Sequence, residues 1–160
     1  MASNILDCTS CGNLFVAFAA VTGFAELKSR RGLEYVFVVE VFWSDKRTTY
    51  IKRTYKDFLR FYRLLFNKLK TKAADPDTGW RRIPRLEGRK WFRRNNRGLA
   101  EIRELELHHF VGDLLRIHPQ VASDPVVVDF FEQRPTDPCP YKEPCYDIDE
   151  DLFSNIPINS

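Results

Sequence analysis

Three short stretches of the sequence gather side chains that could bind phosphate. "KRTY" brings together Lys52, Arg53 and Tyr55, "GRKWFRR" covers residues 88–94, and "EIRE" contributes Arg103. Guanidinium groups grip phosphate oxygens through paired hydrogen bonds, and the face of a tyrosine can pack on a ring. These residue types favour the binding of a phosphorylated ligand, although core packing explains Tyr55 equally well.

The stretch "GRKWFRR" combines cations with large aromatic side chains. Its residues of interest are Arg89, Lys90, Trp91, Phe92, Arg93 and Arg94. At a membrane interface, aromatic rings enter the headgroup region while cations meet lipid phosphates, so the stretch suits contact with a membrane. An equally good interpretation makes Trp91 and Phe92 a hydrophobic plug that ties the loop to the core.

The charge of the chain is unevenly distributed. Residues 46–103 carry 19 Lys/Arg and 5 Asp/Glu, a balance of +14, whereas residues 135–160 carry one Lys and six acids, a balance of −5. A basic surface of this density attracts nucleic acid, anionic membrane or a phosphorylated partner. An ordinary solvated surface is the alternative.

The sequence shows no set of residues typical of an enzyme. There is no glycine-rich phosphate loop and no HExxH or GxSxG pattern, and the adjacent His108 and His109 cannot bind one metal as an i, i+4 pair would. We expect no catalytic residue, no metal and no cofactor. "CTSC" and the later pair Cys139 and Cys145 could form a zinc site, but free intracellular thiols are the favoured interpretation.

The elements that must position these residues follow from hydrophobic patterning. Apolar, β-branched runs at residues 14–27, 34–43 and 48–53 predict an antiparallel three-stranded meander. A 3.6-residue period predicts a helix after residue 55, a second over residues 99–117 whose buried side includes Leu99, Ile102 and Leu105, and a short closing helix with Ser123 as N-cap. The fold class is therefore α+β, a three-stranded antiparallel sheet packed against a helical subdomain.

The domain organisation is one compact unit with two loose ends. We expect a flexible N-terminus over residues 1–12, a folded domain over residues 13–137, and an acidic tail or linker over residues 138–160. No run reaches the ~18 apolar residues of a membrane span, and the first residues lack the positive charge of a secretory signal. An intracellular soluble protein is expected.

The chain resembles a phox-homology (PX) domain. The motifs are "YVFVVEVFWSD", "YIKRTYKDF", "RRIPRLEGRKWF", "EIRELELHHFV" and "FFEQRPTD", spread over residues 14–137, and they are most similar to the PX domains of NADPH-oxidase organisers and Tks-type SH3-PX scaffolds. The resemblance implies the fold predicted above. It also implies a phosphoinositide-binding, membrane-targeting module of an adaptor, in the cytoplasm and peripheral on endosomal or plasma membrane.

The resemblance further implies roles for four residues. Arg53 is expected to contact a phosphate, and the ring of Tyr55 is expected to pack against one face of the inositol ring. Lys90 would meet the lipid's 1-phosphate, and Arg103 the inositol hydroxyls or distal phosphates. The family usually has an arginine for the 3-phosphate where this chain has Thr54, which leaves the preferred phosphoinositide open.

Two alternatives to lipid binding remain at this stage. One is a protein-interaction module with a degenerate lipid pocket, whose basic face binds an acidic partner. Protein partners of an SH3-PX scaffold fit either view. The other is nucleic-acid binding, which we do not expect because the sequence lacks a base-stacking platform or a recognised motif.

Overall fold

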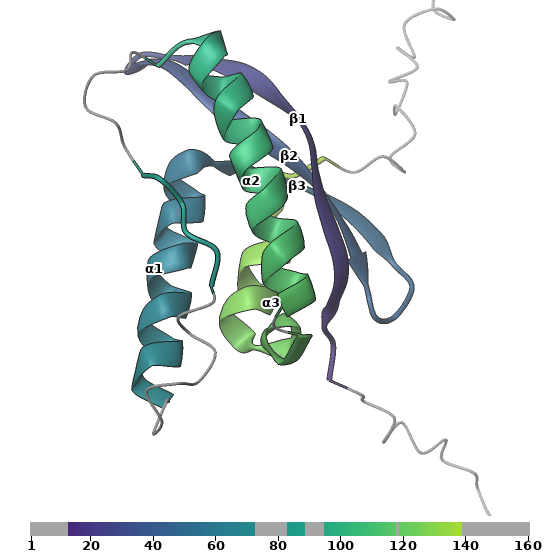
Figure 1. The fold of residues 1–160 in the computed structure, drawn as a ribbon. Helices are drawn as coiled ribbons and strands as arrows, with labels where there is room; N and C mark the ends of the chain where they lie inside the picture. The colour runs from purple at the N-terminus through teal and green to yellow at the C-terminus, as the bar shows by residue number, and fades with distance from the viewer. Residues whose placement is uncertain (1–12, 73–82, 89–94, 118, 139–160) are drawn as a thin grey trace, which may run out of the picture.

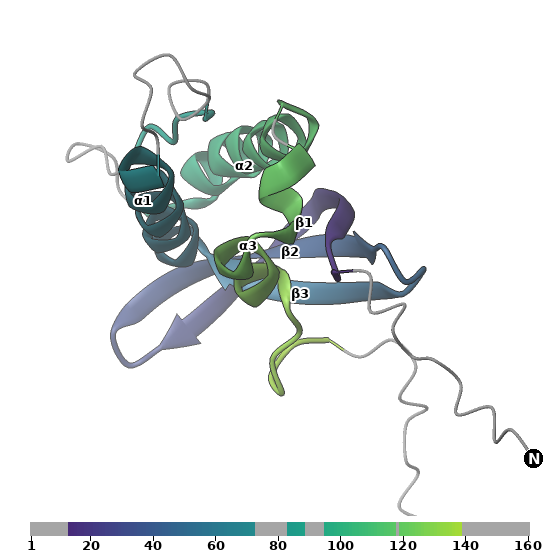
Figure 2. The same ribbon diagram turned by 90° about the horizontal axis from the view of Figure 1, so that it is seen from below.

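A computed structural model describes residues 13–72, 83–88, 95–117 and 119–138. The elements are β1 (Val16–Ser29), β2 (Gly32–Trp43), β3 (Thr48–Thr54), α1 (Tyr55–Lys72), α2 (Arg97–Ile117), the 3-10 helix η2 (Pro119–Ser123) and α3 (Pro125–Phe131). The strands form one antiparallel sheet in the order β1-β2-β3, and α1, α2 and α3 lie on one side of it (Figures 1 and 2). The predicted α+β architecture is confirmed. The expected loose ends, residues 1–12 and most of 138–160, lie outside the described residues.

The strand register decides which side chains face the helices. Val39 of β2 lies opposite Val21 of β1 and Ile51 of β3, and all three side chains are buried. Because side chains alternate between the two faces of a strand, Arg53 shares the inward face of Ile51. Lys52, between them, is exposed.

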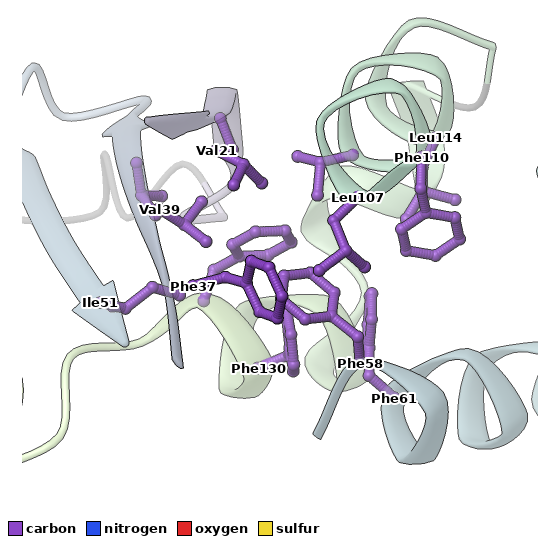
Figure 3. Close-up of a cluster of buried hydrophobic side chains, with 14 of the residues drawn as sticks. Val21, Phe37, Val39, Ile51, Phe58, Phe61, Leu107, Phe110, Leu114 and Phe130 are labelled. Atoms are coloured by element: carbon purple, nitrogen blue, oxygen red, sulfur yellow. The ribbon is translucent and has the colours of Figure 1, made fainter. Parts of the chain in front are cut away.

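The core is filled largely by aromatic and branched side chains. Figure 3 shows valines of the sheet facing phenylalanines of the helices across one cluster. The rings of Phe61 on α1 and Phe130 on α3 are stacked, with centroids 4.1 Å apart, and Phe58 meets Phe130 edge-on at 5.0 Å. This cluster fixes α1 and α3 against the sheet and so fixes the junction between β3 and α1.

The buried side of α2 differs in part from the prediction. Ile102 and Leu105 are 50% and 61% exposed, while Ala100, Leu107 and Leu114 are buried. Residues three apart fall 60° short of a full turn at each step, so a row through Leu99, Ile102 and Leu105 drifts around the helix away from the core. The helical period of α2 was therefore predicted correctly, but the side of the helix predicted to be buried was wrong in its first half.

The closing helix α3 begins one residue later than predicted. Its N-cap is Asp124, not Ser123, because the Asp124 carboxylate accepts a hydrogen bond from the Val126 N–H at 2.9 Å and Pro125 occupies the first turn. The same carboxylate pairs with the Lys68 ammonium group of α1 at 2.7 Å. The residues of this helix that face the core are buried, namely Val127, Phe130 and Phe131.

Candidate functional site

A pocket of about 480 Å³ opens where the β1–β2 hairpin, the start of α1 and the start of α2 meet. The hairpin contributes Arg31, Leu33 and Glu34, the β3–α1 junction contributes Thr54, Tyr55 and Lys56, and the third side contributes Asn95, Leu99 and Arg103. Each side comes from a different part of the chain. The pocket therefore exists only when the sheet and the helices are assembled.

The lining of the pocket is suited to an anion. Three cations, Arg31, Lys56 and Arg103, face a single carboxylate, that of Glu34, among the described lining residues. Arg31 and Lys56 are exposed and Arg103 is half-buried. A cleft with an excess of one sign of charge and low-dielectric walls concentrates ions of the opposite sign.

Tyr55 and Arg103 form one rigid unit in this pocket. The Arg103 guanidinium carbon lies 4.1 Å from the centre of the Tyr55 ring, which is cation–π geometry. The Tyr55 hydroxyl donates to the Glu106 carboxylate at 3.0 Å and accepts from the Gly88 N–H at 3.2 Å. Burial, followed by the negative charge of Glu106, raises the pKa of Tyr55. Tyr55 therefore stays neutral and holds Arg103 in place.

Thr54 lines the pocket, but its hydrogen bonds stabilise the start of α1. Its hydroxyl and its backbone N–H each contact the Asp57 carboxylate at 2.9 Å, and the Asp57 N–H donates to the Thr54 hydroxyl at 3.2 Å. This reciprocal pattern is a capping box at the start of α1. The residue at this position consequently supplies no cation to the pocket.

Arg53 lies in the protein interior, which differs from the prediction that it contacts the ligand. It is 1% exposed and is absent from the described pocket lining. Its guanidinium group pairs with Asp137 at 2.9 Å and donates to the carbonyl oxygens of Phe130 at 3.1 Å and Glu132 at 2.7 Å. The reason is the strand alternation, which turns Arg53 inward beside Ile51 and leaves Thr54 facing the pocket.

Asp137 completes this buried network. Besides the arginine, its carboxylate accepts hydrogen bonds from the backbone N–H groups of Lys52 and Arg134, both at 2.8 Å. The pair therefore fastens the segment after α3 to the edge strand β3.

The remaining predicted residues belong to the stretch that follows Gly88. Arg89, Lys90, Trp91, Phe92, Arg93 and Arg94 lie outside the described residues. The described chain reaches the pocket just before them, since Gly88 contacts Tyr55 and Leu86 packs against the core. The four cysteines also lie outside the described ranges, within which no group of three or more metal-binding side chains occurs.

Sequence reasoning missed three residues of the pocket. Arg31 belongs to the turn "KSRRG", Lys56 follows Tyr55 directly, and the Asn95 side chain donates to the Leu33 carbonyl at 2.6 Å. The cluster of three cations in a short hairpin was the available signal for Arg31. Its proximity to Arg103 depends on long-range packing, which local pattern does not reveal.

The comparison with known families agrees with the fold. A sequence model described as "PX domain" matches residues 41–134. The chain belongs to the PX domain family. Domains of this family bind phosphoinositides and bring their proteins to membranes. A solved structure described as a designed CISK-PX domain shares the fold, with a TM-score of 0.58, 18% identity, and coverage of 72% of this chain and 99% of that one.

The curated relatives of this PX domain are much longer proteins. It is 34% identical over 110 residues to SH3 and PX domain-containing protein 2A of Homo sapiens, which covers 68% of this chain and 10% of that protein. The mouse SH3 and PX domain-containing protein 2B is 32% identical over the same length, covering 68% and 12%. The chain thus spans about a tenth of the curated relatives it matches. No helix within the described ranges is long and apolar enough to cross a membrane.

Proposed function

We propose that this PX domain binds the headgroup of a phosphoinositide and thereby targets an adaptor or scaffold protein to a membrane. The observation that carries the proposal is the pocket, in which Arg31, Lys56 and Arg103 converge and Tyr55 holds Arg103 in position. Its volume of about 480 Å³ falls within the range of pockets that hold small ligands.

The chemistry of the lining supports an inositol phosphate. The Arg103 guanidinium offers several donors in a plane, which suits phosphate or a pair of hydroxyls. Lys56 and Arg31 add charge at the exposed side of the pocket, where a second phosphate would lie. Glu34 can accept a hydrogen bond from an inositol hydroxyl.

The stretch after Gly88 is proposed as the membrane-facing part of the site. In this proposal Lys90 meets the 1-phosphate, and the other residues of the loop contact the bilayer, namely Arg89, Trp91, Phe92, Arg93 and Arg94. Two weak attachments, a headgroup pocket and an interfacial loop, give stable membrane residence where one does not. We place the protein in the cytoplasm, peripheral on endosomal or plasma membrane, as a binding module and not an enzyme.

Thr54 favours a second candidate function. It occupies the position at which the family usually has its 3-phosphate arginine, and its hydroxyl is engaged with Asp57. A pocket that has lost lipid affinity would leave the basic face to an acidic protein partner, in an SH3-PX scaffold or elsewhere.

Arg103→Ala separates these two functions. We expect it to weaken binding to vesicles that contain a phosphoinositide by about tenfold, because it removes a charged hydrogen-bond donor worth about 1.5–3 kcal/mol. Flotation with each mono- and polyphosphorylated inositide in phosphatidylcholine measures the effect. The control Arg63→Ala removes an exposed arginine of α1 that does not line the pocket.

The outcome for the lipid proposal depends on both variants. Binding that requires an inositide and falls for Arg103→Ala but not Arg63→Ala supports the pocket. Equal binding to phosphatidylserine vesicles without inositide, unaffected by Arg103→Ala, would exclude the pocket and favour the acidic-partner function. Thermal melting of both variants shows whether the fold is retained.

A further inference from the structure

Glu106 joins three parts of the chain, although it does not line the pocket. Its carboxylate accepts from the Tyr55 hydroxyl at the start of α1, at 3.0 Å, and from the backbone N–H of Glu87, at 2.6 Å. Glu87 belongs to residues 83–88, which lie between α1 and α2 (Figures 1 and 2). One side chain of α2 therefore holds both the aromatic wall of the pocket and the segment beside it.

The Tyr55 hydroxyl closes this network from the other side. It accepts a hydrogen bond from the Gly88 N–H at 3.2 Å, so that the successive backbone donors of Glu87 and Gly88 both end on the Glu106–Tyr55 pair. Hydrogen bonds to a charged acceptor are stronger than those between neutral groups. The backbone at residues 87 and 88 is thus fixed relative to Tyr55, and the cation–π contact of Tyr55 fixes it relative to Arg103.

The chain continues from this network towards Lys90. Gly88 has a φ of 78°, a conformation that glycine adopts readily and other residues rarely do, and it ends the described segment. Lys90 follows two residues later, so the chain keeps its Cα within about 7 Å of the Gly88 Cα. A fixed Gly88 consequently limits how far Lys90 can lie from the pocket.

The charge of Glu106 has the wrong sign for a direct role in binding an anion. Glu106 lies nearly one helical turn after Arg103 on α2, and a carboxylate near a phosphate site repels the ligand. It favours binding only if its hydrogen bonds contribute more than its charge opposes. Preorganisation supplies such a contribution, because a side chain that is already ordered loses less entropy when the ligand binds.

We propose that Glu106 is a positioning residue of the headgroup site. It holds the Tyr55 ring, and with it Arg103, in the orientation that the ligand meets, and it anchors the segment that leads to Lys90. The inference rests on the proposed function for the identity of the ligand, an inositol phosphate. It assigns to a residue outside the pocket a contribution to affinity that outweighs the effect of its charge.

Glu106→Ala is expected to weaken the binding of soluble inositol phosphates about fivefold, because the ligand must then order a side chain that is ordered in advance in the wild type. The matched control is Glu104→Ala, which removes the same charge from α2 at the residue that follows Arg103. Glu104 does not line the pocket and makes no hydrogen bond or ion pair within the described ranges. The control should bind as tightly as wild type or more tightly. Isothermal titration calorimetry measures the affinities.

Glu106→Gln separates the hydrogen bonds from the charge. Glutamine keeps an oxygen that accepts hydrogen bonds but carries no charge, so we expect an affinity between those of Glu106→Ala and wild type. An effect of charge alone predicts the same gain in affinity for both variants. Thermal melting shows whether each variant is folded at the temperature of titration, and Glu106→Gln decides the test if Glu106→Ala is not.

Amide hydrogen exchange gives a second measurement that needs no ligand. In Glu106→Ala the amide hydrogen of Glu87 should exchange with solvent at least tenfold faster, since it loses a hydrogen bond to a charged group. Glu104→Ala should leave this exchange rate unchanged. Nuclear magnetic resonance of the full chain measures the rate for each variant.

The outcomes distinguish the positioning role from the proposed function. Weaker binding for the Glu106 variants than for wild type and Glu104→Ala, with faster exchange at Glu87, supports the inference. Equal or tighter binding for the Glu106 variants would overturn it while leaving the proposed function intact, whether or not the exchange at Glu87 is faster. A wild-type chain that binds no inositol phosphate would overturn the proposed function, and with it the contribution of Glu106 to affinity.

Discussion

Arg53→Ala is expected to lower the free energy of unfolding by about 3–5 kcal/mol, the usual cost of removing one partner of a buried ion pair. The change leaves the Asp137 carboxylate, 2% exposed at its side chain, without its cation. It also deprives the carbonyl oxygens of Phe130 and Glu132 of their donor. Urea denaturation followed by circular dichroism measures the loss as a lower midpoint.

The neighbouring Lys52→Ala serves as the control. Lys52 is exposed, and its contact with Asp137 is made by its backbone N–H, so removing the side chain should change the free energy of unfolding by at most about 0.5 kcal/mol. A double-mutant cycle with Asp137→Ala should give a coupling energy of at least 1 kcal/mol, since contacting charges are not additive.

The same experiment distinguishes a structural arginine from a ligand-binding one. If Arg53 acts only through the fold, the folded fraction of Arg53→Ala at low temperature should bind phosphoinositide vesicles nearly as wild type does. A variant that unfolds at the wild-type midpoint and yet loses headgroup binding would contradict the buried position of Arg53 and restore it as a ligand.

The fold was largely predictable from local pattern. The β-branched runs between turn residues gave three strands, and the 3.6-residue period gave three helices. The errors came where two patterns competed. On α2, the exposed Ile102 and Leu105 lie at helical spacing from Leu99, and sequence alone does not tell which of two apolar rows faces the sheet. At α3, Ser123 and Asp124 are both good N-cap residues.

The site was less predictable, because it joins residues that are far apart in the chain. Tyr55 and Arg103 were named on resemblance, and the structure places them in contact. Arg31 was missed because nothing local connects the first hairpin with α2. Arg53 could have been placed by strand parity, since Ile51 and Arg53 must share a face if β3 continues to Thr54.

Thr54→Arg is expected to increase affinity for 3-phosphorylated inositides by 10-fold to 100-fold. Thr54 already lines the pocket, and a longer side chain at the same position would add a cation facing Lys56 and Arg103. A charged hydrogen bond to phosphate contributes about 1.5–3 kcal/mol, which sets the size of the gain. Isothermal titration with soluble 3-phosphorylated and 4-phosphorylated headgroups measures it.

The variant should also be less stable by about 1 kcal/mol, the usual cost of losing an N-cap. Thr54→Ser keeps the hydroxyl that accepts from the Asp57 N–H and should retain both stability and affinity. Thr54→Ala should lose the stability without gaining affinity. Together, Thr54→Ser and Thr54→Ala distinguish the contribution of the helix cap to stability from the contribution of the pocket to affinity.

Selectivity is the decisive measurement for Thr54→Arg. A gain restricted to 3-phosphorylated headgroups would show that the pocket keeps the geometry of its family and lacks a single cation. An equal gain for every anionic ligand would show that the added charge acts from a distance, and that the orientation of the headgroup is set instead by Arg103. In either case the capping contact with Asp57 explains why a small hydroxyl residue is stable at this position, because its oxygen satisfies the Asp57 N–H at the start of α1, a donor that an arginine would leave to solvent.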